Sequence, residues 1–347
     1  MLTAADTTRV LSLYDLGKVY KVTPASRGFV NETAFVQTEQ GRFVLRRGHR
    51  RLGEAAQRYR HRLINWLTDH DFPTAELIPV RNSDTLVTLD GRFYEVRTFV
   101  EGGDFTPSRP LQAANVGATL ARYHQVVKNF PPPEKLPPRY SPQTILGLTE
   151  RLLERDFMGE LYDWLSWYDL RAARLRQQLC VRDYAALPHL VIHGDIHCDN
   201  LLFDGDEVAA LLDYDQATWD ARIVDVADGL IGFATASNCT DKLQWGVYPG
   251  PLDEEQAARL IRGYVEVEPL SRAEIEALPL LVEIIWLQGE LGRVISTPEG
   301  SPDYHQDVLN QGRWLSTWMH ERSRHIAAHW LDLTEQAISE AHASIAA

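Results

Sequence analysis

The pattern of apolar and polar positions divides the chain into a first part rich in short strands and a second part rich in helices. Period-two alternation between turn residues predicts strands over 18–22, 32–38, 43–47, 86–89 and 92–100. Apolar residues at helical spacing predict helices over 6–16, 53–70, 111–127, 143–155, 159–183, 253–267, 271–296 and 304–343. These elements predict an α+β protein with a small antiparallel sheet followed by a larger, mainly helical part.

One stretch interrupts the helical part. Residues 191–215 read VIHGDIHCDNLLFDGDEVAALLDYD, and their apolar runs predict three short strands with a turn at Asp204-Gly205-Asp206. Asp195, Asn200 and Asp213 each stand at the end of one of these strands. We therefore expect the three side chains to come together in space, although they would look the same as solvated turn residues of a plain hairpin.

Such a set of oxygen donors suits phosphoryl transfer. Carboxylate and amide oxygens are preferred ligands of Mg²⁺, and a further carboxylate can take the proton of an acceptor hydroxyl. In protein kinases an aspartate, an asparagine five residues later and a downstream aspartate have these roles. The same spacing predicts Asp195 as the base and Asn200 and Asp213 as metal ligands. Asp215 could orient the loop or reach a second metal ion through water.

The motifs HGDIHCDN and LLDYDQA resemble the aminoglycoside phosphotransferase and choline kinase superfamily, whose pattern is H-G-D-x-x-x-x-N, an apolar strand and I-D-[FWY]-[DE]. The helical tail is similar to that of type II homoserine kinases and stress-response kinases in this group. The resemblance implies a bilobal protein-kinase-like fold. It places a nucleotide-binding lobe at residues 1–100 and a catalytic, acceptor-binding lobe at residues 101–347, and it implies ATP and Mg²⁺ as cofactors.

The resemblance also implies a nucleotide site in the first lobe. Gly28, Asn31 and Thr33 match the G-x-x-N-x-T form of a turn that covers phosphates, although an ordinary hairpin loop would look the same. Arg46 takes the position of the usual strand lysine, where a guanidinium can pair with phosphates. As an alternative, Arg46 is a surface arginine on an edge strand. The backbone of Thr98, Phe99 and Val100 is expected to meet the adenine edge.

Arg60 departs from the family pattern. It falls where these proteins carry the helix glutamate that pairs with the strand lysine, and Glu54 is the nearest carboxylate in sequence. Arg46 and Arg60 would not form an ion pair, so we expect the helix to contribute to nucleotide binding in another way.

Three residues around the central stretch are expected to support the reacting groups. Asp225, in DVADGL, matches an aspartate that braces the catalytic loop of the family through backbone N–H groups. His193 is expected to brace the same loop. His197 is expected to orient Asp195 or to touch the substrate.

The net charge, the cysteines and the apolar runs of the chain limit the partners and the location that we expect for this protein. The net charge of −13 over 347 residues argues against a nucleic acid or an anionic membrane as a partner, and it could favour a cationic substrate, although many soluble proteins are acidic. Cys180, Cys198 and Cys239 form no CxxC pair and are expected to be reduced thiols without a disulfide or a zinc site. With no long apolar run and no export signal, a cytoplasmic protein is expected.

The predicted function is an ATP- and Mg²⁺-dependent phosphotransferase that phosphorylates a hydroxyl of a small molecule. The acceptor stays open among an amino alcohol, a homoserine-like amino acid, a sugar and an aminoglycoside. One alternative is a Ser/Thr protein kinase of the stress-response type, but the chain lacks the lysine that protein kinases place two residues after the base. The other is a non-catalytic nucleotide-binding pseudokinase, which only Arg46 and Arg60 support.

Overall fold

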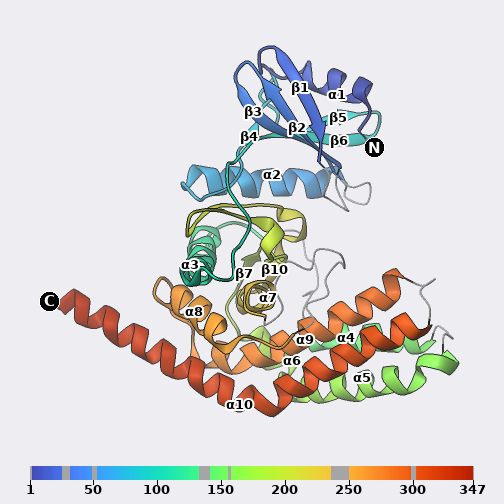
Figure 1. Cartoon of the computed structure of the whole chain (residues 1–347), viewed down its shortest axis with the longest axis vertical. Coiled ribbons are helices and arrows are strands. Elements are labelled where there is room, and N and C mark those ends of the chain that lie inside the picture. The colour runs from blue at the N-terminus through green and yellow to red at the C-terminus, as the bar shows by residue number, and fades with distance from the viewer. Residues whose placement is uncertain are drawn as a thin grey trace. The chain divides into compact units, whose positions relative to one another are not determined.

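The computed structural model describes residues 2–25, 32–48, 53–132, 141–154, 158–235, 250–297 and 302–346. Its elements form two compact units (Figure 1). The first contains residues 1–103 and 201–215, and the second contains residues 104–200 and 216–347. Of the residues singled out in the sequence, Gly28, Asn31 and Cys239 lie outside the described ranges.

The first unit is built on an antiparallel sheet, as the alternating pattern predicts. The strand order is β1-β2-β3-β6-β4, and β5 also pairs with β6. The bounds are β1 Val19–Pro24, β2 Glu32–Thr38, β3 Gly41–Arg47, β4 Leu77–Ile78, β5 Val87–Leu89 and β6 Arg92–Thr98. The sequence analysis missed β4, because two residues are too few to show a period.

Helix α1 spans Ala4–Leu11, so the prediction of a helix over 6–16 was wrong at both ends. Thr3 caps it by accepting a hydrogen bond from the backbone N–H of Asp6. Tyr14 and Leu16 lie beyond the helix, yet both are buried in the core of the sheet. Buried residues of an irregular segment therefore extended the apparent helical pattern. The second helix of this unit, α2, spans Glu54–Asp69.

A hairpin from the middle of the chain completes the first unit. It consists of β8 (Leu201–Asp204) and β9 (Glu207–Leu211). Gly103 and Phe203 exchange two backbone hydrogen bonds, of 2.8 and 3.0 Å, and the N–H of Leu211 donates to the carbonyl of Pro73 at 2.9 Å. Backbone pairing thus joins residues at least one hundred positions apart in sequence. The segment that carries Asp213 and Asp215 belongs to the first unit.

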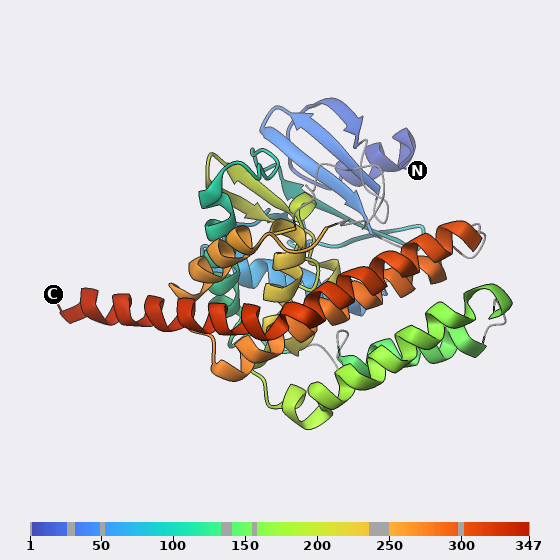
Figure 2. The same ribbon diagram turned by 60° about the horizontal axis from the view of Figure 1, so that its bottom comes forward.

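The second unit is mainly helical, as predicted. One two-stranded antiparallel sheet pairs β7 (His189–Ile192) with β10 (Thr218–Ala221). Helices α9 and α10 lie side by side in both views (Figures 1 and 2). The helices are α3 Pro110–Val127, α4 Pro142–Glu154, α5 Met158–Gln178, α6 Val181–Ala185, α7 Ile223–Phe233, α8 Glu254–Val265, α9 Arg272–Ser296 and α10 Pro302–Ala346. The helix predicted over 159–183 is divided, since α5 ends before α6 begins.

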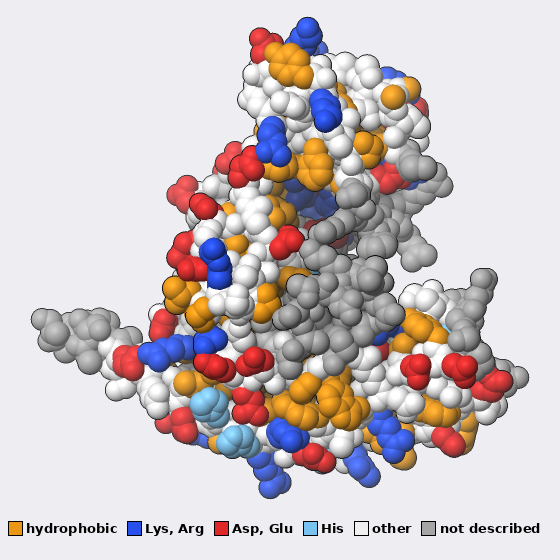
Figure 3. All heavy atoms as spheres, in the orientation of Figure 1, with side chains coloured by type: hydrophobic (Ala, Val, Ile, Leu, Met, Phe, Trp, Pro, Cys, Tyr) orange, Lys and Arg blue, Asp and Glu red, His pale blue; other side chains and the backbone are white. Residues whose placement is uncertain are grey.

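The surface of the second unit mixes charges. On the face shown in Figure 3, acidic and basic side chains are interspersed over its helices, with apolar patches between them. Among the described residues, the structure contains no helix that is both long enough and apolar enough to cross a membrane.

Helices α3 and α8 touch through glycine. A Cβ atom at Gly117 would overlap the carbonyl oxygen of Leu260, and a Cβ at Gly263 would overlap the carbonyl oxygen of Ala114. Both obstacles are backbone atoms of the facing helix, so they cannot move aside as a flexible side chain would. The two glycines therefore set the distance between the helices.

We expect Gly117→Ala to destabilise the protein by about 2 kcal/mol, because overlap with the facing backbone outweighs the roughly 1 kcal/mol by which alanine favours a helix. Gly289→Ala is the matched control, since a Cβ at that position in α9 meets no atom within 4 Å. Urea unfolding should show a loss of stability for Gly117→Ala and none for Gly289→Ala. Equal stability of the two variants would contradict the close contact.

Candidate active site

The predicted catalytic loop follows β7 in the second unit and ends in a short 3₁₀ turn over Cys198–Asn200. The side-chain amide of Asn200 donates to the backbone oxygen of Asp195 at 2.9 Å and lies 3.2 Å from its Oδ2. The Asp195 side chain remains 40% exposed. The loop thus fixes the carboxylate of Asp195 and leaves it accessible to an incoming hydroxyl.

Asp225 lies beneath this loop, fully buried in the first turn of α7. Its carboxylate accepts hydrogen bonds from the backbone N–H of His193 at 2.9 Å and of Gly194 at 2.8 Å, and it lies 3.1 Å from Nε2 of His124. These are the contacts that a bracing role requires. Gly194 has φ +73°, and a Cβ there would come within 2.9 Å of the Gln216 carbonyl oxygen, so the turn needs glycine.

His197 faces the same carboxylate. Its Nε2 lies 3.6 Å from Oδ1 of Asp195 and 3.0 Å from the amide nitrogen of Asn200. Burial by itself would lower the pKa of His197, but its hydrogen bond to Asp195 outweighs burial and raises the pKa to about 10. A protonated ring can donate to Asp195 but cannot accept from Asn200, so its favourable interaction is with the carboxylate.

Asp228 is a second carboxylate beneath the loop, partly buried, that the sequence analysis missed. It lies one turn after Asp225 on α7, and its Oδ2 accepts from the backbone N–H of Ile196 at 2.6 Å. Burial and the negative charge of Asp195 raise the pKa of Asp228 to about 7. The spacing of three residues from Asp225, which puts both on one helix face, was the only available signal.

We expect Asp228→Asn to change how stability depends on pH. The pKa of Asp228 is higher in the folded state than in the unfolded chain, so its contribution to stability falls as pH rises from about 4 to about 7. Asparagine keeps an oxygen for Ile196 and removes the titration. Because Asp228 keeps some solvent contact, the variant should gain about 1–2 kcal/mol relative to the parent between pH 4.5 and 8.

Urea unfolding at the two pH values measures this gain. Asp199→Asn is the control, since Asp199 lies in the same loop with a side chain that is 65% exposed. A stability difference between Asp228→Asn and the parent that does not vary with pH would contradict the assignment.

In the first unit, Arg46 lies on the acidic pair that follows β9. Its Nη2 donates to Oδ1 of Asp213 at 2.8 Å and to Oδ2 of Asp215 at 2.7 Å. The Arg46 side chain is 10% exposed. Burial would lower its pKa, but the charges of Asp213, Asp215 and Glu95 outweigh burial and hold the pKa above its usual range. Arg46 is therefore an enclosed ion-pair centre, and its alternative interpretation as a surface arginine was wrong.

Arg60, on α2, also faces Asp215. Its Nη2 donates to the backbone oxygen of Asp215 at 2.6 Å, and its Nε lies 3.6 Å from Oδ1 of the same residue. Burial lowers the pKa of Arg60, while the charge of Asp215 opposes this effect. Glu54, the alternative partner for Arg46 in the sequence, instead pairs with Arg58 at 2.8 Å.

The carboxylate nearest to Arg46 apart from this acidic pair comes from a strand. Glu95 on β6 lies opposite Arg46 in the β3–β6 ladder, and its Oε1 is 3.5 Å from Nη1 of Arg46. The same Oε1 lies 2.5 Å from Nη2 of Arg97, and the other oxygen, Oε2, lies 2.6 Å from Nε2 of His61. The sequence analysis missed Glu95, because a charged residue in an alternating strand is typical of a solvent-facing position.

The other described residues predicted to bind the nucleotide are Thr33 and the segment from Thr98 to Val100. Thr33 pairs with Arg46 in the β2–β3 ladder. The N–H of Thr98 donates to the Glu76 carbonyl, and the N–H of Phe99 donates to the Arg42 carbonyl. A contact between this segment and an adenine edge would therefore have to use carbonyl groups or Val100.

The oxygen donors predicted for a metal ion differ in accessibility. Asn200 uses its amide nitrogen on Asp195, so its amide oxygen is the atom that a cation would meet. Asp213 is 38% exposed, whereas Asp215 is 9% exposed between Arg46 and Arg60. Within the described ranges, His, Cys, Asp and Glu side chains form no cluster of three that could hold a metal ion by themselves. Carboxylate and amide oxygens are donors that hard cations prefer, and the carboxylate of Asp213 is more accessible than that of Asp215.

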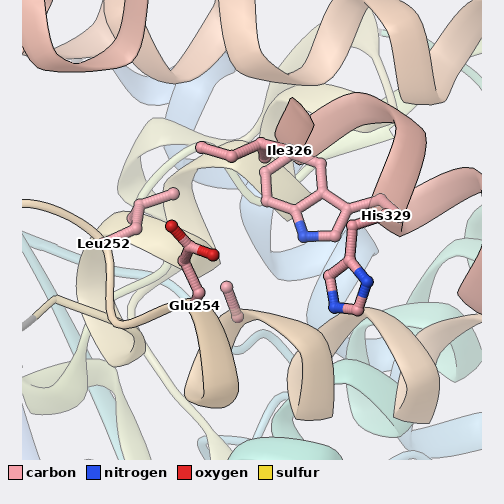
Figure 4. Close-up of a pocket in the computed structure, with 6 residues that line it drawn as sticks. Leu252, Glu254, Ile326 and His329 are labelled. Carbon is pink, nitrogen blue, oxygen red and sulfur yellow. The ribbon is translucent and has the colours of Figure 1, made fainter. Parts of the chain in front are cut away.

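The second unit also contains a pocket. Its lining includes the apolar side chains of Leu252 and Ile326 together with Glu254 and His329 (Figure 4). None of the predicted site residues lines it.

We compared the fold and the sequence of this chain with those of known proteins. The fold is similar to that of an amicoumacin kinase solved with AMP-PNP and Ca²⁺, with a TM-score of 0.69 at 16% identity over 91% of this chain and 94% of that one. Homoserine kinase of Parvibaculum lavamentivorans is 26% identical over 302 residues, which cover 84% of this chain and 86% of that protein. Homoserine kinase of Gluconacetobacter diazotrophicus is 28% identical over 330 residues, which cover 92% and 95%.

The fold is thus that of a phosphotransferase with a kinase-like architecture. The chain belongs to the phosphotransferase enzyme family, whose profile matches residues 21–278. It is a small-molecule kinase with an alcohol group as acceptor. The resemblance stated from the HGDIHCDN and LLDYDQA motifs is confirmed, as are the bilobal kinase-like fold and the enzyme class.

Proposed function

We propose that this protein is an ATP- and Mg²⁺-dependent kinase whose acceptor is a homoserine-like amino acid. The observation that carries the reaction type is the accessible carboxylate of Asp195, held by Asn200 on a loop that Asp225 braces. Homoserine comes first among the acceptors because the curated relatives that cover most of the chain are homoserine kinases. An amino alcohol, a sugar and an aminoglycoside follow it.

Asp195 would act on the acceptor hydroxyl. The hydroxyl oxygen attacks the γ-phosphorus, the bond from that phosphorus to the β–γ bridging oxygen breaks, and the hydroxyl proton passes to the Asp195 carboxylate. Because the transition state of phosphoryl transfer is loose, positioning supplies more of the rate than proton abstraction does. The bonds from Asn200 and the charge of His197 serve this positioning.

Asn200 and Asp213 would hold the divalent cation, with Asp215 as a less accessible donor. When bound, the cation would neutralise negative charge on the phosphates. Arg46 would pair with phosphate oxygens once its guanidinium is available to them. Thr33, beside Arg46, would lie near the same phosphates.

The first test is an ADP-release assay with Mg·ATP against homoserine, amino alcohols, sugars and aminoglycosides. We expect one strong acceptor, and we expect Asp195→Asn to lower turnover on it by about 10²–10⁴-fold while ATP binding persists, because only the base and orienting group is lost. Asp199→Asn, in the same loop with an exposed side chain, should keep its turnover.

The outcomes separate the candidate functions. A strong acceptor other than homoserine would correct the substrate and keep the reaction. Turnover in Asp195→Asn that equals the parent rate would remove Asp195 from the role of base. If no compound in the panel stimulates ADP release while ATP still binds, a protein acceptor or a non-catalytic role would be favoured.

A second test addresses the metal ion. Asp213→Ala should raise the half-saturating Mg²⁺ concentration by about tenfold or more, because it removes the more exposed of the two carboxylates. A titration of Mg²⁺ at fixed ATP concentration, in which nucleotide binding is recorded at each step, measures this change. Asp204→Ala is the control, since Asp204 is exposed at the turn of the same hairpin. A half-saturating Mg²⁺ concentration equal to that of the parent would refute the role of Asp213.

A further inference from the structure

Arg46 has more acidic partners than one guanidinium can serve during the proposed reaction. Asp213, Asp215 and Glu95 all lie within 3.5 Å of its terminal nitrogens. The hydrogen bond to Asp213 uses Oδ1 of the carboxylate to which the proposed function assigns the cation. A divalent cation and a guanidinium compete for such a carboxylate, so Arg46 needs another anchor when the cation binds.

Glu95 has the geometry of that anchor. Its side chain is 5% exposed and is fixed on one side by His61, whose Nε2 lies 2.6 Å from Oε2. The other oxygen, Oε1, forms ion pairs with Nη2 of Arg97 at 2.5 Å and with Nη1 of Arg46 at 3.5 Å, but neither contact has the geometry of a hydrogen bond. Oε1 can therefore accept a hydrogen bond from Arg46, whose Nη1 has only a short distance to move.

We propose that Glu95 is the positioning residue that holds Arg46 for the nucleotide phosphates, in place of the helix glutamate that Arg60 replaces in this chain. When the cation binds Asp213, Arg46 moves one hydrogen bond from Asp213 to Oε1 of Glu95 and turns its remaining N–H groups to phosphate oxygens. This inference rests on the proposed function, because it requires Mg·ATP at this site.

The charge balance favours the exchange. Burial would raise the pKa of Glu95, but the positive charge of Arg97, the hydrogen bond from His61 and the charge of Arg46 outweigh it and hold the pKa below its usual range. Glu95 therefore stays ionised. Arg60 keeps the backbone oxygen of Asp215 through a separate bond, so the segment after β9 stays attached when Arg46 leaves Asp213.

The decisive measurement is calorimetric binding of adenosine, ADP and ATP, all with Mg²⁺ present, to the full chain and to Glu95→Gln. Loss of the anchor should weaken ADP and Mg·ATP roughly tenfold and leave adenosine unchanged, because only phosphates meet Arg46. Asp84→Asn is the matched control, since it removes one carboxylate of the same unit, paired with Arg58. It should bind all three compounds as the parent does.

A double variant tests the route through Arg46. Arg46→Met/Glu95→Gln should bind ADP no more weakly than Arg46→Met alone, because Glu95 acts only through Arg46. Glu95→Asp, which keeps the charge but shortens the side chain, should show a smaller loss that is again confined to phosphate-bearing ligands. Glu95→Asp therefore serves as the test variant if Glu95→Gln does not fold.

The results distinguish this inference from the proposed function. If the parent binds ADP no better than adenosine, the nucleotide site itself is wrong. If the parent prefers ADP but Glu95→Gln has the same preference, the site stands and the role of Glu95 is overturned. An equal loss for adenosine and ADP would show that Glu95 only supports the fold, and it would overturn the inference too.

Discussion

The buried ion-pair centre of Arg46 is the interaction on which the first unit depends. Its guanidinium joins β3 to Asp213 and Asp215, which lie more than 160 positions later in the sequence. Buried charges gain little net stability, because desolvation offsets their attraction, but removing one partner typically costs about 3–5 kcal/mol. The arginine therefore specifies where the end of β9 lies, more than it adds to the stability of the unit.

The second unit fixes the loop that carries Asp195 by a different means. The carboxylate of Asp225 satisfies two backbone N–H groups of the loop, and Asp228 satisfies a third at Ile196. Gly194 supplies the left-handed turn between them. Asp195 is consequently held through the backbone on both sides, which leaves its own carboxylate accessible. The raised pKa of His197 keeps a positive charge beside the carboxylate of Asp195.

Residues close together in sequence were predictable, and those joined only by the fold were not. Asp195 and Asn200 are five residues apart, so their contact follows from one loop motif. Glu95 meets Arg46 only through the β3–β6 register. The alternation of β6 gives no guidance, because Tyr94, Glu95, Val96 and Arg97 are all buried and both faces of the strand are covered. Propensity likewise gives no sign that α5 ends before α6, since the apolar pattern continues across the break.

Asp213 carries backbone strain as well as charge. Its φ of +61° lies in the left-handed region, where a residue with a Cβ costs roughly 1–2 kcal/mol. Asp71, Ser83 and Asp90, the other such non-glycine residues of the described ranges, stand at the end of a helix or in turns. Asp213 differs because it sits between the buried end of β9 and a buried tyrosine, with its carboxylate on Arg46. A strained residue persists where its surroundings hold it. The hydrogen bond from Arg46 is one of the contacts that hold Asp213 in this conformation.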